Sequence, residues 1–147
     1  MRQEDVQLVA KLFNSLNILF KSISPYAQSV EVSNTFKSFL DRAKQIYYVE
    51  LGAGEPSILS KINEGYSLLN QIPKCFVPTT NCNNEHRNWG KRVEDHTYDL
   101  LSEFKKRGID FGYSKEVEPF RFDEKNLLKI AFIVVTGLII INLLKGK

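Results

Sequence analysis

Residues 129–147, KIAFIVVTGLIIINLLKGK, decide how this chain is organised. Between Ile130 and Leu144 there is no charged residue. In a helix these residues would cover roughly 22 Å of a hydrocarbon layer about 30 Å thick, and two leucines just before the stretch lengthen the apolar run. The pattern predicts one C-terminal transmembrane helix within residues 123–147. A buried helix of a soluble protein, or a helix lying in an interface with partners, is the alternative interpretation.

The rest of the chain is long enough for one small domain. The whole chain has a net charge of +3, of which residues 123–147 contribute +2. A nucleic-acid binder normally has a stronger basic bias, so nucleic acid is not expected as a partner. The start, MRQEDVQLV, is acidic within five residues and lacks a long apolar stretch, so no cleavable signal peptide is expected. Insertion through the C-terminal segment alone would make this a tail-anchored protein.

Four stretches of the head, residues 1–108, carry apolar side chains at spacings of three and four, the pattern of amphipathic helices. These helices are predicted over residues 6–23, 33–51, 56–72 and 89–107. No alternation of apolar and polar residues lasts long enough to predict a strand. The predicted fold is therefore all-α: a small helical bundle head of three to four amphipathic helices, followed by the single transmembrane helix.

Prolines and a serine are expected to set several helix ends. The first helix should stop before Pro25, because a proline pushes the preceding residue out of the helical region. Ser33 would be the N-cap of the second helix, and Pro56 suits the first position of the third. The apolar faces predict a core that includes Leu12, Leu40 and Leu69.

Both cysteines and one of the two histidines fall in residues 73–88, PKCFVPTTNCNNEHRN, which read as a loop because Pro, Thr and Asn cluster there. Cys75 and Cys82 could form a disulfide in an oxidising compartment, and two free thiols are the simpler alternative. Together with His86 and His96 they could offer four zinc ligands. Their spacing, C-x6-C-x3-H-x9-H, lacks the close pairs of a structural zinc site, so neither a metal nor another cofactor is assigned.

Nothing in the sequence matches a catalytic motif. The chain contains no G-x-G-x-x-G or G-x-x-x-x-G-K-[ST] loop and no recognisable Ser, His and Asp set or paired-carboxylate motif. The expected class is therefore a protein without enzymatic activity, with no catalytic residues to name.

Residues 88–93, NWGKRV, carry one short resemblance. Asn88, Trp89 and Gly90 with the basic residues after them resemble the Asn-Trp-Gly-Arg signature of the tail-anchored apoptosis regulators of the Bcl-2 family, which are helical bundles that bind amphipathic helices. In that family a strongly apolar central helix follows, whereas here Glu94 and Asp95 come at once. The match covers only these six residues, and no membership is assigned.

Residues 109–122, IDFGYSKEVEPFRF, form an irregular aromatic segment just before the predicted membrane helix. One interpretation is an extended segment that packs across the bundle. The other is an interfacial segment, because aromatic rings and basic side chains suit the headgroup layer of a bilayer. The candidate interfacial residues are Phe120, Arg121, Phe122, Lys125, Lys129 and Lys145.

Asn142 is the most polar residue of the predicted membrane helix. A hydrogen bond from its amide to another helix within hydrocarbon would stabilise helix association by about 0.6–2 kcal/mol. Leu138 and Val135 lie on the same face of an ideal helix, so these three residues are the candidates for contact with another membrane helix. The alternative is that Asn142 lies close enough to the interface to be hydrated.

These patterns favour a non-catalytic, single-pass, tail-anchored subunit or adaptor of a membrane protein complex. Its expected partners are the other subunits of that complex and the lipid bilayer. A short anchor flanked by lysines favours a mitochondrial membrane, with the endoplasmic reticulum as the alternative. The alternative function is an organelle-surface regulator or receptor that binds a partner's amphipathic helix.

Overall fold

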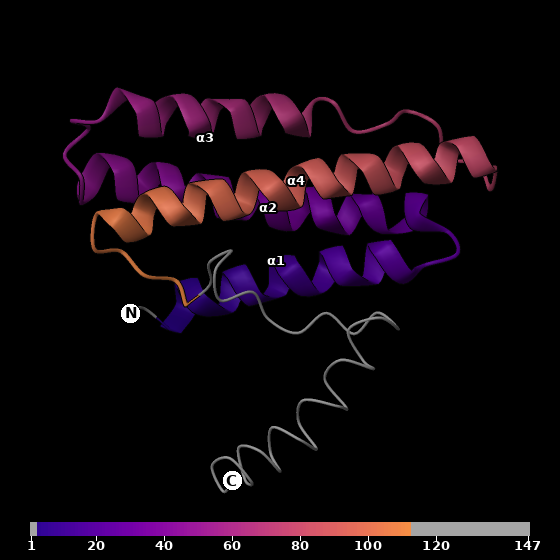
Figure 1. The fold of residues 1–147 in the computed structure, drawn as a ribbon, viewed down its shortest axis with the longest axis horizontal. Coiled ribbons are helices and arrows are strands. Elements are labelled where there is room, and N and C mark those ends of the chain that lie inside the picture. The colour runs from indigo at the N-terminus through magenta and orange to yellow at the C-terminus, as the bar shows by residue number, and fades with distance from the viewer. Residues whose placement is uncertain (1–2, 113–147) are drawn as a thin grey trace, which may run out of the picture. The chain divides into compact units, whose positions relative to one another are not determined.

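The computed structural model describes residues 3–112, which fold into four α-helices (Figure 1). Their bounds are α1 Gln3–Lys21, α2 Pro25–Val49, α3 Pro56–Leu69 and α4 Thr80–Lys106. No strand occurs within this range, so the prediction of an all-helical bundle head is confirmed. The predicted transmembrane helix lies outside the described residues. Within residues 3–112, no helix combines the length and the apolar character needed to cross a bilayer.

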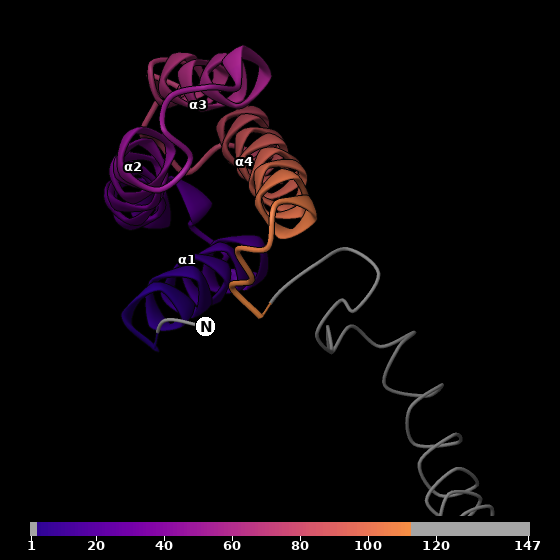
Figure 2. The same ribbon diagram turned by 90° about the vertical axis from the view of Figure 1, so that its left-hand side faces the viewer.

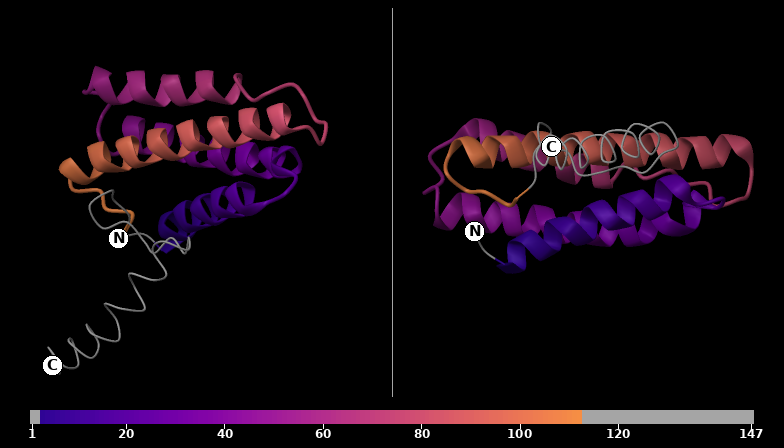
Figure 3. Two further views of the ribbon diagram at one scale, coloured as in Figure 1. Left: turned by 45° about the vertical axis from the view of Figure 1, so that its right-hand side comes forward. Right: turned by 60° about the horizontal axis from the view of Figure 1, so that its bottom comes forward.

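The four helices form a bundle in which successive helices run in opposite directions (Figure 1). Seen end-on, α1 and α3 occupy opposite corners, while α2 and α4 face each other across the shorter diagonal (Figure 2). In agreement with this view, α4 contacts each of the other three helices, and α1 and α3 share no contact. Figure 3 shows α4 running along the bundle between α3 and α1. The last helix therefore closes the core.

The second helix begins earlier than the sequence predicts. Its first residue is Pro25, so Ser33 lies inside α2 and its prediction as an N-cap is wrong. Proline is favoured at this position because the first N–H groups of a helix have no partner within the helix anyway. Pro25, Ser29 and Val32 face the core, which adds two turns to the buried face of α2. Pro56 occupies the first position of α3, as expected.

The fourth helix also begins earlier, at Thr80 rather than at Trp89. Thr79 is its N-cap, and the Thr79 hydroxyl accepts a hydrogen bond of 3.1 Å from the backbone N–H of Cys82. The assignment of residues 73–88 to a single loop is therefore wrong in its second half. As a consequence, Cys82 and His86 are separated by one helical turn and lie on the same face of α4.

The core is built from apolar side chains of all four helices. Leu12 and Leu40 are fully buried, as predicted. On α3 the prediction is shifted by one residue, because Leu68 is buried while Leu69 is only partly buried against the core. Trp89 is the largest buried side chain, and its indole N–H donates a 2.8 Å hydrogen bond to the carbonyl of Leu68, which joins α4 to the end of α3.

Glycine permits one close approach between helices inside this core. A Cβ atom at Gly65 on α3 would lie 2.5 Å from Cδ2 of Leu40 on α2 and 2.9 Å from Cε1 of His96 on α4. Real Cβ atoms essentially never come so close to a neighbour. The missing side chain at Gly65 is therefore what lets α3 settle against both α2 and α4.

Two further contacts fix the edges of the bundle. Asp5 of α1 is buried and accepts two hydrogen bonds from the guanidinium of Arg42 on α2, at 2.7 and 3.1 Å. Beyond α4, Phe111 is buried between Phe39 and Phe104. The centroid of its ring lies 6.2 Å from that of Phe39 and 5.8 Å from that of Phe104. The start of the segment 109–122 thus packs on the head.

Candidate functional site

Cys75, Cys82 and His86 meet at the end of the bundle where α1 turns into α2 and where the α3–α4 loop lies. Cys75 lies in that loop and is joined to Cys82 of α4 by a disulfide, with 5.9 Å between the two Cα atoms. His86 is fully buried beneath the loop, and the ring of Phe76 lies 5.3 Å from its own, centroid to centroid. The disulfide and the buried ring together hold the loop against α4.

Both ring nitrogens of His86 are hydrogen-bonded. Nε2 lies 2.6 Å from the backbone carbonyl oxygen of Cys75, and Nδ1 lies 2.6 Å from the hydroxyl of Ser29 on α2. A carbonyl can only accept, so Nε2 donates to it, whereas the Ser29 hydroxyl can either donate to Nδ1 or accept from it. His86 therefore links α2, α4 and the loop. Ser29 was not recognised from the sequence, because its partner lies 57 residues further along the chain.

Three of the four possible zinc ligands of the sequence come together in this cluster. One ligand atom from each of Cys75, Cys82 and His86 lies within 4.8 Å of the other two. His96 does not join them. Its Nε2 donates to the carbonyl of Lys61 on α3, 2.6 Å away. The sequence signal for the cluster was the spacing of four between Cys82 and His86, which has meaning only once α4 is known to begin at Thr80.

His96 lies beside a polar hollow of about 290 Å³ between α3 and α4. Glu64, Ser67, Gln71 and Arg92 line the hollow, and Arg92 donates a hydrogen bond to Gln71. The Nδ1 atom of His96 is buried and has no hydrogen-bond partner within residues 3–112. Loss of hydration lowers the pKa of His96 below its ordinary value of 6.5, and this outweighs the opposing effects of the Lys61 carbonyl, Glu64 and Asp99.

We expect His96 to make the head less stable in acid. Because its folded-state pKa is lower than the unfolded value of 6.5, the unfolded chain binds the proton more readily, and stability falls as the pH drops below about 6.5. In His96→Gln the side-chain amide can still donate to the Lys61 carbonyl but does not titrate. Thermal unfolding of the full chain at a series of pH values should show a smaller loss between pH 7 and pH 5 in this variant than in wild type. Equal losses in both proteins would contradict the assignment.

Three exposed apolar side chains lie at the same end of the bundle as the disulfide. Ile23 in the α1–α2 turn has 88% of its surface exposed, and Phe76 and Val77 in the α3–α4 loop are about half exposed. The carbonyl of Ile23 accepts a hydrogen bond of 3.4 Å from Asn83 of α4, which brings the turn next to the helix that the disulfide joins to the loop. We call Ile23, Phe76 and Val77 the turn-end patch.

The backbone beneath the turn-end patch is held in place. Arg87 of α4 donates a 2.7 Å hydrogen bond to the carbonyl of Ser22, the residue before Ile23. On the other side, the disulfide and the His86 bond to the Cys75 carbonyl fix the residue before Phe76. A partner would therefore meet exposed apolar groups on a surface that is already ordered, so little conformational entropy would be lost on binding.

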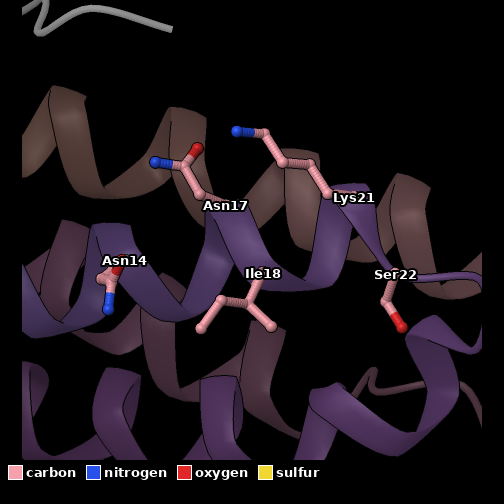
Figure 4. A pocket seen from close by; sticks show the side chains of 5 residues that line it. All are labelled: Asn14, Asn17, Ile18, Lys21 and Ser22. Atoms are coloured by element: carbon pink, nitrogen blue, oxygen red, sulfur yellow. The ribbon is translucent and has the colours of Figure 1, made fainter. Parts of the chain in front are cut away.

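A second hollow, of about 440 Å³, lies on the outer face of α1. Figure 4 shows that its side chains spread around the helix and do not converge on one point. Among the described residues it is lined by Asn14, Asn17, Ile18, Lys21 and Ser22. Only one of these five side chains is apolar, so the hollow suits the apolar face of a helix poorly.

Most of the candidate residues from the sequence lie outside the described residues. This holds for the membrane-helix contact candidates and for all interfacial candidates: Val135, Leu138, Asn142, Phe120, Arg121, Phe122, Lys125, Lys129 and Lys145. We also compared the chain with protein-family models, with curated proteins and with solved structures. None of these three comparisons finds a match.

Proposed function

We propose that this chain is a non-catalytic subunit or adaptor of a membrane protein complex, held in the membrane by residues 123–147 and bound to its neighbours through the helical head. The observation that carries this proposal is the turn-end patch on its ordered backbone. Apolar side chains at the centre of a contact, on a surface that need not rearrange, are the usual source of binding energy between proteins. The anchor would hold the head at the membrane surface where such neighbours lie. A mitochondrial membrane remains our preferred location.

The alternative of a regulator that accepts a partner's amphipathic helix is less well supported. Such a function needs an apolar groove along the bundle. The hollow on α1 and the hollow beside His96 are both lined mainly by polar side chains. Several buried polar groups of the head also have internal roles, since Ser29 and His86 bind each other and Asp5 binds Arg42. We therefore favour a surface contact at the end of the bundle.

The proposal predicts that the turn-end patch is needed for assembly. In the full chain, Ile23→Asp should weaken association with the complex on the order of tenfold or more, because a charge would be placed where an apolar contact forms. Ile23 is 88% exposed, so the head should still fold. Val49 is the matched control: it is 74% exposed and lies at the opposite end of α2. The measurement is migration on a native gel after mild detergent extraction.

Wild type and Val49→Asp should migrate with a large complex, and Ile23→Asp should migrate as a free chain. If all three migrate as a free monomer or dimer, the chain is not a subunit of a complex that survives extraction. If Val49→Asp alone is released, the contact lies at the other end of the bundle.

In a parallel test, a chain that ends at Glu124 should no longer pellet with carbonate-washed membranes. If it still pellets, the single-anchor interpretation is wrong.

A further inference from the structure

We propose that Cys75, Cys82 and His86 form a zinc site when the Cys75–Cys82 disulfide is reduced. Thiolates and imidazole are the ligands that Zn²⁺ prefers in proteins. The site does not depend on the anchor or on a partner, so it can be correct or wrong independently of the function proposed above. It would let the same loop be held closed in both oxidising and reducing compartments.

The three ligand atoms already lie close together, and breaking the S–S bond lets the two sulfurs separate to the spacing that zinc needs. In a tetrahedral site with ordinary Zn–S and Zn–N bond lengths, neighbouring ligand atoms are about 3.5–3.8 Å apart. Here one donor atom from each of the three residues lies within 4.8 Å of the others, and two of these residues share one face of α4. Cys75 comes from the loop and is half-buried, so it can move inward and solvent can supply a water as the fourth ligand.

Ser29 allows His86 to change its tautomer without leaving a buried nitrogen unpaired. In the disulfide form Nε2 donates to the Cys75 carbonyl, and the Ser29 hydroxyl is paired with Nδ1, to which it can donate its hydrogen. To bind zinc through Nε2, the ring must carry its hydrogen on Nδ1. The hydroxyl oxygen of Ser29, 2.6 Å from Nδ1, then accepts this hydrogen, and its own hydrogen can turn to the carbonyl of Pro25, 3.4 Å away. Zinc-bound histidines usually have such a hydrogen bond on their other nitrogen.

The chemistry balances with a dithiol as reductant. The dithiol supplies two electrons and two protons, the S–S bond breaks to give the two thiols of Cys75 and Cys82, and the reductant becomes a disulfide. Zn²⁺ then forms two Zn–S bonds and one Zn–N bond, and the two thiol protons leave to solvent. Oxidation reverses the sequence and releases the metal. Because only thiolates bind the metal, disulfide and zinc exclude each other.

The test uses the full chain in mild detergent, reduced with a phosphine, freed of the reductant and titrated with Co²⁺. Reduced wild type should bind one Co²⁺ per chain with the strong visible absorption of tetrahedral thiolate coordination, and Zn²⁺ should displace it. The oxidised chain should bind none at the same concentration. Cys75→Ser is the most direct variant because Cys75 is half-buried in a loop, and it should lower the affinity at least about 100-fold.

Two more variants separate the site from a general loss of structure. Ser29→Ala keeps all three ligands and should weaken Co²⁺ binding by about 10–100-fold, since it removes the hydrogen bond on Nδ1. His96→Gln alters the histidine outside the cluster and should bind as wild type does. The proposal is overturned if reduced wild type shows no stoichiometric, thiolate-type binding. It is equally overturned if Cys75→Ser binds as tightly as wild type while the helical circular dichroism of both is the same.

Discussion

Trp89→Ala should lower the free energy of unfolding of the head by about 3–5 kcal/mol, the usual cost of removing a large aromatic side chain from a core. The ring is 2% exposed and lies where α4 packs on the end of α3. Truncation would remove its packing and also the hydrogen bond to the Leu68 carbonyl. Such a loss is a large share of the stability of a small domain, so the variant should be partly unfolded at physiological temperature. Urea unfolding of the full chain, followed by far-ultraviolet circular dichroism, measures the effect.

Trp89→Phe is the matched control. It retains most of the buried ring and loses only the indole N–H, while the Leu68 carbonyl still accepts a 3.0 Å hydrogen bond from the backbone of Gln71. We therefore expect a much smaller loss than in Trp89→Ala, dominated by about 1 kcal/mol for the missing hydrogen bond. If both variants unfold at the wild-type urea concentration, Trp89 does not lie in the core.

The second large effect concerns Leu40 and Gly65, which touch across α2 and α3. Leu40→Ala should cost about 2–5 kcal/mol, because it leaves a cavity at a fully buried position. Gly65→Ala should cost about 1–3 kcal/mol through overpacking, since the new methyl group would lie 2.5 and 3.0 Å from the two Cδ atoms of Leu40. This outweighs the gain of about 1 kcal/mol that alanine brings to a helix interior.

The double variant distinguishes this packing from simple additivity. Once Leu40 is shortened, the methyl group of Gly65→Ala no longer meets the two Cδ atoms of Leu40 and fills part of the cavity. The loss in the double variant should therefore be smaller than the sum of the two single losses, by about 0.5–3 kcal/mol. Fluorescence of Trp89, the only tryptophan of the chain, follows unfolding in all four proteins. Strict additivity would mean that the two residues do not touch.

Local signals in the sequence were sufficient to predict the helical class and several helix ends. Pro25 ends the first helix region and Pro56 begins the third helix, because each acts on its own backbone. The starts of α2 and α4 were placed too late. In each added stretch the apolar period is interrupted, because Ser29 is among the buried positions of α2 and Cys82 and His86 are the buried positions of α4.

Those three residues also explain why the candidate site could be predicted only in part. A buried Ser or His gives no apolar period, and its burial is stable only because a partner far along the chain satisfies its hydrogen bonds. The contact between Ser29 and His86 has no local signal at all. Cys75, Cys82 and His86 could be named from the sequence as possible ligands, but to know that His86 and not His96 joins the cysteines required the helix start at Thr80.

The position of α4 has a consequence for the order in which the head can fold during synthesis. The chain leaves the ribosome from its N-terminus, and α1 and α2, joined by a three-residue turn, can pair as soon as both have emerged. Yet α4 contacts all three earlier helices, so the apolar side chains of α1–α3 that pack on α4 stay uncovered until α4 has emerged. During that interval the nascent chain would be a client for chaperones, and truncated translation products ending before α4 should aggregate or be degraded.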